Sequence, residues 1–177
     1  MDCKRIDFLE STLKQVIDWL KFAEAKNGAL IAVGCATIFG VFRMYTSLNE
    51  VNGLITYYVI TFLTLTAASV VLSLMSFIPR MDPPFWISMP EKLDTDNPLF
   101  FGHACKYSKR TYLDLFNKYI ESSASNSLNI ESAISDQIVN NSRIAFIKFS
   151  IFGSAVFLFL AGILTPVGAL FLYWVKK

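Results

Sequence analysis

Residues 149–175 read FSIFGSAVFLFLAGILTPVGALFLYWV and contain no charged side chain over twenty-seven positions. An α-helix rises ~1.5 Å per residue, so about twenty apolar residues cross the ~30 Å hydrocarbon core of a bilayer. This stretch is therefore long enough to span a membrane. Once it is accepted, two further apolar runs, residues 27–42 and 51–79, become candidates for spanning helices.

The composition agrees with an integral membrane protein. Of 177 residues, 54% are hydrophobic and 17% are charged, whereas about 25% are charged in ordinary soluble domains. A net charge of +2 gives no indication of a nucleic-acid partner. The three cysteines match no metal or disulfide spacing, which predicts unpaired thiols in a reducing compartment.

An amphipathic helix is expected over residues 4–26, and no Pro or Gly separates it from the first span. Its apolar face needs a partner, which is another soluble helix, another subunit or the membrane surface. Spacings of three and four place these residues on that face: Ile6, Leu9, Leu13, Val16, Ile17 and Leu20.

Between the second and third spans, five of the six prolines fall in residues 79–98, so no helix is expected there. Pro79 and Arg80 end the second span. A helix is predicted over about 108–121, and a turn over 122–129. A last helix is predicted from Asn129 through Lys148 into the third span, with Ile130, Ile134 and Ile138 on one face.

The predicted fold is therefore all-α, with three transmembrane helices and a small cytoplasmic helical module, two helices running continuously from the cytoplasm into the membrane. The expected segments are a cytoplasmic amphipathic helix (1–26), two transmembrane helices with a short external turn (27–79), a cytoplasmic helical segment (80–148) and a third transmembrane helix (149–177).

The distribution of positive charge predicts the orientation. Residues 80–148 hold eight Lys or Arg, the segment before Gly28 holds five, and the turn at 46–53 holds none. Because cytoplasmic segments are enriched in Lys and Arg, the N-terminus and the central segment are expected in the cytoplasm. Lys176 and Lys177 oppose the external C-terminus that three spans imply.

Small and hydroxyl-bearing residues mark faces for helix packing. Small residues recur every fourth position in the first span, and Gly162 lies on a small face of the third span with Ala155 and Ala169, as in closely packed membrane helices. The hydroxyl stripe of the second span predicts an interhelical contact or a water-facing side. The small stripe is Gly28, Ala32, Ala36 and Gly40, and the hydroxyl stripe is Thr66, Ser69, Ser73 and Ser76.

Catalytic chemistry is not indicated. The single histidine and the absence of nucleophile-elbow, phosphate-loop or zinc-protease motifs predict a protein that is not an enzyme and holds no metal or cofactor. The carboxylates of the central segment show no pairing for acid–base catalysis, so we expect them on the solvated surface. They are Asp94, Asp96, Asp114, Glu121, Glu131 and Asp136.

Cations mixed with aromatic side chains predict a site for a small anionic ligand with a flat base, which needs a cation for its phosphate and a ring for stacking. The alternative remains open that these cations meet lipid headgroups or set the topology. The candidate binding residues are Phe101, Lys106, Lys109, Arg110, Tyr112, Arg143 and Lys148.

Several stretches in this order resemble the transmembrane effectors of Pycsar, the bacterial cyclic-pyrimidine antiphage system. They are FAEAKNGALIAV at 22–33, Pro79-Arg80, NPLFFG at 97–102, Tyr112, and SRIAFIK at 142–148. The resemblance implies that a cyclase product, cyclic CMP or cyclic UMP, is sensed in the cytoplasm. Damage to the inner membrane then arrests or kills the infected cell.

The same resemblance implies that the residues on matching stretches matter for function: Glu24, Lys26, Asn97, Phe101, Tyr112, Arg143 and Lys148. Glu24 and Lys26 stand where the first helix enters the membrane, which suits coupling or an ion pair between helices. Because three spans enclose no pore, a homo-oligomer in the bacterial inner membrane is expected.

Three alternatives remain. The two-span effectors of cyclic-oligonucleotide (CBASS) defence are similar in outline, so a cyclic oligonucleotide is a second possible trigger. An adaptor that recruits a cytoplasmic partner without any ligand is another reading. A small transporter subunit is disfavoured, because transport sites usually need ionisable groups inside the membrane.

Overall fold

The computed structural model describes the backbone of residues 2–49, 52–78, 82–120 and 129–175, with side chains for those between 4 and 165. Pro79, Arg80, Glu121, nearly all of the turn expected at 122–129 and the side chain of Ala169 lie outside the described part.

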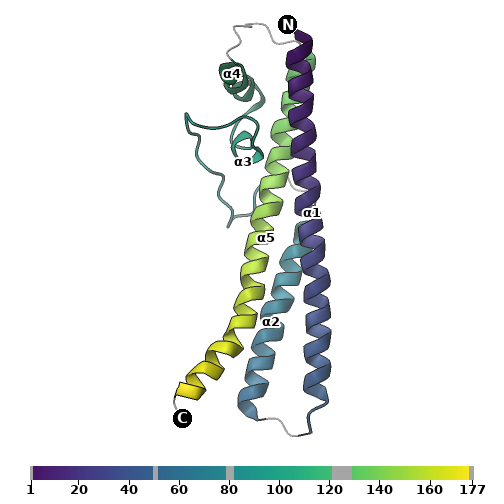
Figure 1. The fold of residues 1–177 in the computed structure, drawn as a ribbon, viewed down its shortest axis with the longest axis vertical. Helices are drawn as coiled ribbons and strands as arrows, with labels where there is room; N and C mark the ends of the chain where they lie inside the picture. The colour runs from purple at the N-terminus through teal and green to yellow at the C-terminus, as the bar shows by residue number, and fades with distance from the viewer. Residues whose placement is uncertain (1, 50–51, 79–81, 121–128, 176–177) are drawn as a thin grey trace. The chain divides into compact units, whose positions relative to one another are not determined.

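All described secondary structure is helical, which confirms the all-α prediction (Figure 1). The helices are α1 (Asp2–Thr46), α2 (Gly53–Met75), α3 (Phe101–Ala104), α4 (Lys109–Tyr119) and α5 (Asn129–Val175). The proline-rich residues 82–100 form no helix. Within the described residues, three helices are long and apolar enough to cross a membrane: α1, α2 and α5. The protein is therefore a membrane protein, and α1 and α5 extend well beyond the length that a bilayer requires.

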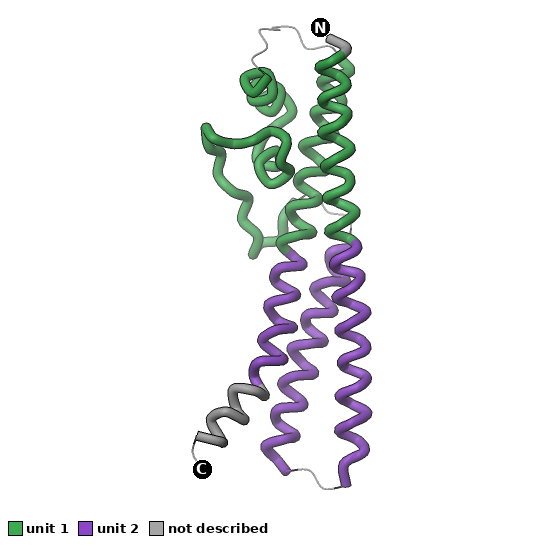
Figure 2. The backbone as a smooth tube through the Cα atoms, viewed as in Figure 1, with its two compact units in different colours: residues 1–24, 79–150 green, residues 25–78, 151–177 purple. Residues whose placement is uncertain are grey.

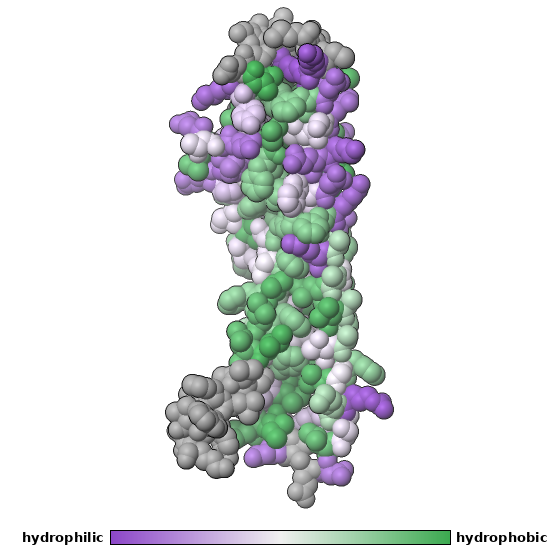
Figure 3. All heavy atoms as spheres, viewed as in Figure 1, coloured by the Kyte–Doolittle hydropathy of each residue, from purple (hydrophilic) through white to green (hydrophobic). Residues whose placement is uncertain are grey.

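Two compact units divide the chain (Figure 2). Unit 1 comprises residues 1–24 and 79–150, and unit 2 comprises residues 25–78 and 151–177. Helices α1 and α5 each contribute residues to both units without a break in the helix. In the space-filling view, hydrophilic side chains gather over unit 1 and hydrophobic ones over unit 2 (Figure 3). Exposed Phe39, Ile60 and Phe157 belong to the apolar surface of unit 2.

Unit 1 is built on the first part of α1 and the first part of α5, which run parallel and side by side (Figure 1). Two ion pairs set their register. Arg5 pairs with Glu131 at 3.0 Å near the start of both helices, and Glu24 pairs with Lys148 at 2.8 Å further along both. An antiparallel pair would have brought Arg5 close to residue 148 instead.

The apolar face predicted for the first helix finds its partner within the same chain. Leu9, Val16 and Ala23 are fully buried and lie seven residues apart, as in a coiled-coil seam. From α5, Ile138 and Ala145 are also fully buried. Helices α3 and α4 complete this core through Phe101, Ala104, Tyr112 and Phe116.

The isoleucine face predicted for α5 is partly wrong. Ile138 is buried, but Ile130 is 51% exposed. Glu131 takes the buried position beside it because its carboxylate pairs with the buried Arg5. The small residues Ser135 and Ser142 hold further buried positions, so the seam combines a salt bridge and small side chains with isoleucine.

In unit 2, α2 packs against both α1 and α5. A Cβ added to Gly34 would come within 2.5 Å of Val70 Cγ2, so α1 approaches α2 closely there. Ser69 Oγ donates a hydrogen bond to the Ala155 carbonyl of α5 at 2.7 Å. The rest of the hydroxyl stripe is buried as well (Thr66, Ser73 and Ser76), so in this structure it serves helix packing.

The stripe of small residues on α1 is not an interface within the described chain. Ala32, Ala36 and Gly40 are exposed, and a Cβ added to Gly28 or Gly40 would meet no described atom within 4 Å. The small stripe is exposed because α1 faces α2 with a different side, the one that carries Leu30 and Gly34. Close packing of the small stripe against a further membrane helix stays a prediction.

Candidate functional site

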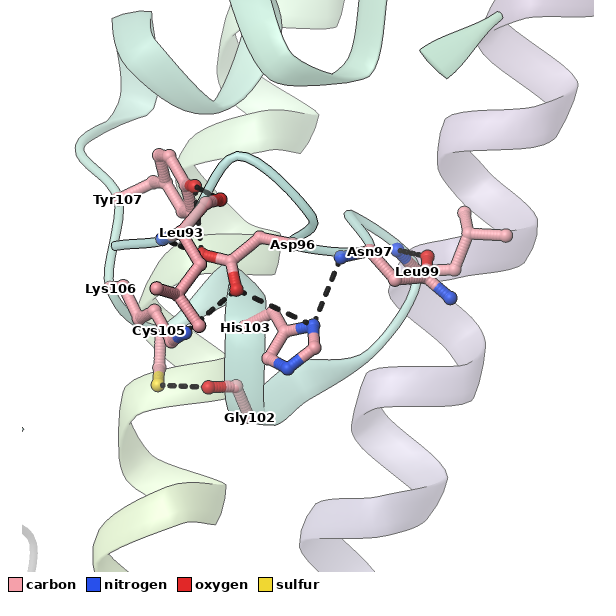
Figure 4. A network of polar contacts seen from close by, with 9 residues as sticks. All are labelled: Leu93, Asp96, Asn97, Leu99, Gly102, His103, Cys105, Lys106 and Tyr107. Carbon is pink, nitrogen blue, oxygen red and sulfur yellow. Dashed lines mark hydrogen bonds and ion pairs between the residues drawn. The ribbon is translucent and has the colours of Figure 1, made fainter. Parts of the chain in front are cut away.

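A buried polar network joins the proline-rich segment to α3 and its following turn (Figure 4). The Asp96 side chain is 1% exposed, and its carboxylate accepts three hydrogen bonds. Oδ1 accepts from Lys106 Nζ at 2.7 Å, while Oδ2 accepts from the Tyr107 hydroxyl at 2.8 Å and from the Leu93 amide at 3.0 Å. The network therefore fixes the segment before α3 onto the turn that follows it.

These contacts also set the protonation states. Burial on its own raises the pKa of Asp96, but hydrogen bonds from Lys106, Leu93 and Tyr107 outweigh it and lower the pKa to about 2. For Tyr107, burial and the bond to Asp96 raise the pKa to about 12. At neutral pH the carboxylate is charged and the phenol is a neutral donor.

The expectation of solvated carboxylates is wrong for two residues. Measured over the whole residue, Asp96 is only 6% exposed and Glu131 only 1% exposed. Each is buried beside a cation, Lys106 for Asp96 and Arg5 for Glu131. Burial of a charged carboxylate costs desolvation free energy. A nearby cation and hydrogen bonds offset this cost, whereas nothing offsets it for an isolated carboxylate.

His103 is held in one orientation at the edge of this network. Its Nδ1 accepts a hydrogen bond from the Asn97 amide at 2.9 Å and lies 3.7 Å from Asp96 Oδ1. Because Nδ1 is an acceptor, the neutral ring carries its proton on Nε2. Asn97 in turn accepts from the Leu99 amide through Oδ1 at 2.9 Å. The His103 side chain remains 35% exposed.

An open pocket of about 520 Å³ adjoins the network within unit 1. This volume lies within the ~300–1,000 Å³ that small-molecule sites occupy. The lining is mostly apolar and aromatic, with a few polar groups. The lining residues are Pro90, Phe100, Phe101, Gly102, His103, Lys106, Phe146, Phe149 and Ser150.

Stacked rings form the wall of the pocket. Phe101 and Phe149 are nearly parallel, with ring centres 5.2 Å apart, and Phe100 lies 4.8 Å from Phe101. Trp19 of α1 packs on both Phe101 and Phe149, at 5.6 and 6.2 Å. One ring cluster therefore links α1, α3 and α5.

Gly102 allows the Phe100 ring to lie against the backbone of α3. A Cβ at position 102 would approach Phe100 Cε1 to 2.5 Å, which is closer than carbon atoms tolerate. Any other residue here would push the ring out of its place in the pocket lining.

Two of the predicted ligand residues line the pocket. They are Phe101 and Lys106, and the ammonium group of Lys106 is already engaged by Asp96. Lys109 and Arg110 are exposed in the first turn of α4 and do not belong to the lining. Tyr112 is a core residue: it is fully buried, its hydroxyl donates to the Pro98 carbonyl at 3.0 Å, and burial raises its pKa.

The remaining predicted residues make contacts between elements. Arg143 Nε donates to the Cys105 carbonyl at 3.2 Å and its Nη2 donates to the Tyr107 carbonyl at 3.1 Å, which ties α5 to the turn after α3. Lys148 pairs with Glu24. In unit 2, Lys26 Nζ lies 5.4 Å from the centre of the Phe152 ring.

Sequence reasoning missed His103, Phe146 and Phe149 as pocket residues. His103 matches no motif in the sequence, and Phe149 begins the apolar run that predicts the third span. The usable signal was the FFGH run, in which a glycine follows two aromatic residues and precedes the single histidine.

Replacing Asp96 by asparagine should lower the stability of unit 1 by about 3 kcal/mol, because it leaves the buried Lys106 ammonium without a counter-charge. The wild-type protein should itself lose about 2 kcal/mol as the pH falls from about 4 to about 2. The pKa of Asp96 is lower in the folded state than in the unfolded state. The stabilisation from its ionised form is therefore complete at pH values above the pKa of the unfolded state, and it is lost once the pH falls below the pKa of the folded state.

Thermal unfolding of the detergent-solubilised protein measures both effects. The matched control is Asp94→Asn, because Asp94 is exposed two positions away. Equal melting temperatures for Asp96→Asn and Asp94→Asn would show that the network contributes nothing to stability.

The fold and the site together define a class, a membrane protein with three apolar helices and a helical unit that carries an aromatic pocket. The chain matches the Pycsar effector protein domain over residues 8–175. It belongs to this family, whose role is that of an antiphage defence effector. No curated protein and no solved structure matches the chain.

Proposed function

We propose that this effector senses a cyclic pyrimidine nucleotide, cyclic CMP or cyclic UMP, through unit 1 and then disrupts the bacterial inner membrane through unit 2. The observation that carries the proposal is the continuity of α1 and α5, since residues of both helices belong to both units. A ligand that displaces either helix in unit 1 displaces the membrane portion of that helix as well, because packed helices shift as rigid elements.

The orientation follows from the positive-inside rule. Eight Lys or Arg residues lie in 80–148 and five lie before Gly28, whereas the turn at 46–53 has none. This pattern supports a cytoplasmic unit 1, which is the compartment in which a nucleotide second messenger is made.

Membrane damage requires several copies, because three apolar helices enclose no pore. The exposed small stripe of α1 supports a contact between copies, since small residues let membrane helices approach closely. The assembled form is therefore a homo-oligomer in contact with lipid, without a cofactor or a nucleic-acid partner.

Dye release from proteoliposomes tests this function. Purified protein should release an entrapped dye when cyclic CMP or cyclic UMP is added, and linear CMP and UMP serve as matched controls. Calorimetry on the same preparation measures binding separately from leakage.

Neither leakage nor binding with either nucleotide would refute the sensing step. If only a cyclic oligonucleotide caused leakage, the activating ligand would be that oligonucleotide and not a cyclic mononucleotide. Stoichiometric capture of a soluble protein without any leakage would favour an adaptor.

A further inference from the structure

The pocket in unit 1 offers two kinds of recognition side by side. Its aromatic wall includes the rings of Phe100 and Phe149. Phe100 is 43% exposed, and Phe149 is partly exposed. Ring faces of this kind hold planar groups by stacking, an interaction worth ~1–3 kcal/mol for a nucleobase. The pocket therefore favours a ligand with a flat ring.

The polar side of the pocket fits one negative charge. His103 Nδ1 accepts a hydrogen bond from the Asn97 amide, so the ring's donor is Nε2–H, which has no hydrogen-bond partner among the described residues. Figure 4 shows this second nitrogen facing away from Asp96 and Asn97. Lys106 adds positive charge nearby, although Asp96 already neutralises most of it. One free donor beside a balanced ion pair suits a monoanion better than a group with two or three charges.

We infer that this pocket binds a small monoanionic ligand with a single flat ring, which stacks on Phe100 and Phe149 and accepts a hydrogen bond from His103 Nε2. The inference rests on the proposed function, in which the ligand is a cyclic mononucleotide: one base and one phosphodiester charge. A cyclic dinucleotide has two bases and two charges and would leave one of each outside this site.

The position of the pocket gives the ligand direct contact with α5. Phe146, Phe149 and Ser150 line it and all belong to that helix. Phe149 also packs on Trp19 and Phe22 of α1, at 6.2 and 6.3 Å. A ligand that stacks on Phe149 therefore touches the ring cluster between the two long helices of unit 1.

Calorimetry with cyclic CMP and cyclic UMP on the full chain in neutral-lipid nanodiscs tests the inference. His103→Asn keeps an acceptor for the Asn97 amide but removes the donor at the Nε2 position, and should weaken binding by ~10-fold or more. Phe100→Leu should weaken binding by a similar factor, since it removes the stacking face. The matched control is Phe85→Leu, which should bind as the wild type does because Phe85 is 96% exposed and outside the pocket.

The outcomes separate the site from the function. If the wild type binds nucleotide and both pocket variants bind equally well, the pocket inference is wrong and the proposed function stands. If the wild type binds no nucleotide, the sensing proposal fails, and the inference fails with it.

A lipid phosphodiester has the same anionic chemistry, so a second titration uses a short-chain phosphatidylglycerol. Binding of this lipid that is lost in His103→Asn, without nucleotide binding, would assign the pocket to a headgroup and overturn the inference. Melting temperatures of both variants close to that of the wild type confirm that the fold is retained.

Discussion

Replacing Gly162 by leucine should abolish the toxicity that the proposed function assigns to the activated effector, whereas Gly162→Ala should leave it nearly unchanged. A Cβ at position 162 would lie 3.4 Å from Leu65 Cβ and 3.6 Å from Phe62 Cδ2, which is ordinary van der Waals contact. The additional carbons of leucine have no room against α2, and overpacking of this kind costs about 1–3 kcal/mol. The small residue therefore sets how closely α5 and α2 pack.

Survival of cells that make both the effector and the proposed cyclic nucleotide measures this effect, with uptake of a membrane-impermeant dye as a second readout. Nucleotide binding should be the same for all three proteins, because Gly162 belongs to unit 2. Full toxicity of the leucine variant would contradict the packing argument, and so would equal loss of toxicity with alanine.

Reversing the charge of Glu24 or of Lys148 should impair protection against phage, and reversing both together should restore much of it. The Lys148 side chain is 9% exposed and its partner is 44% exposed, at a distance of 2.8 Å. Glu24→Lys places two positive charges in contact, one of them nearly buried, at a cost of about 1–3 kcal/mol after solvent screening. The swapped pair Glu24→Lys with Lys148→Glu recovers the attraction.

Plaque counts measure protection, and melting in detergent measures stability. Lys21→Glu is the matched control. Its ion pair with Asp18 lies on the same helix, has a separation of 3.9 Å between Lys21 Nζ and Asp18 Oδ1, and is well exposed. The prediction fails if the double variant is no better than the single ones, since the two side chains would then not act through their ion pair.

The spans and the long helices were predictable because their signal is local. An uncharged run of residues 149–175 specifies a spanning helix without reference to the rest of the chain. The unbroken helical pattern before Gly28 likewise predicted that α1 passes from one unit to the other. The partner of its apolar face could not be chosen, because three environments satisfy the same periodicity.

The pocket was only partly predictable because it joins distant segments. Phe100 and His103 meet Phe146 and Phe149 of α5 more than forty residues later. Phe149 begins an apolar run, so its role in unit 1 was masked by the membrane signal. Asp96 differs from the exposed Asp94 only by its tertiary partners, which no local pattern specifies.

The parallel pairing of α1 with α5 has a consequence for biosynthesis. The ion pair of Glu24 with Lys148 joins positions 124 residues apart, so it forms only after most of the chain has been translated. A ribosome that stalls before Asn129 releases a product with α1 and α2 but without the helix that completes either unit. We therefore expect partial translation products to be inactive, because α5 completes both unit 1 and unit 2.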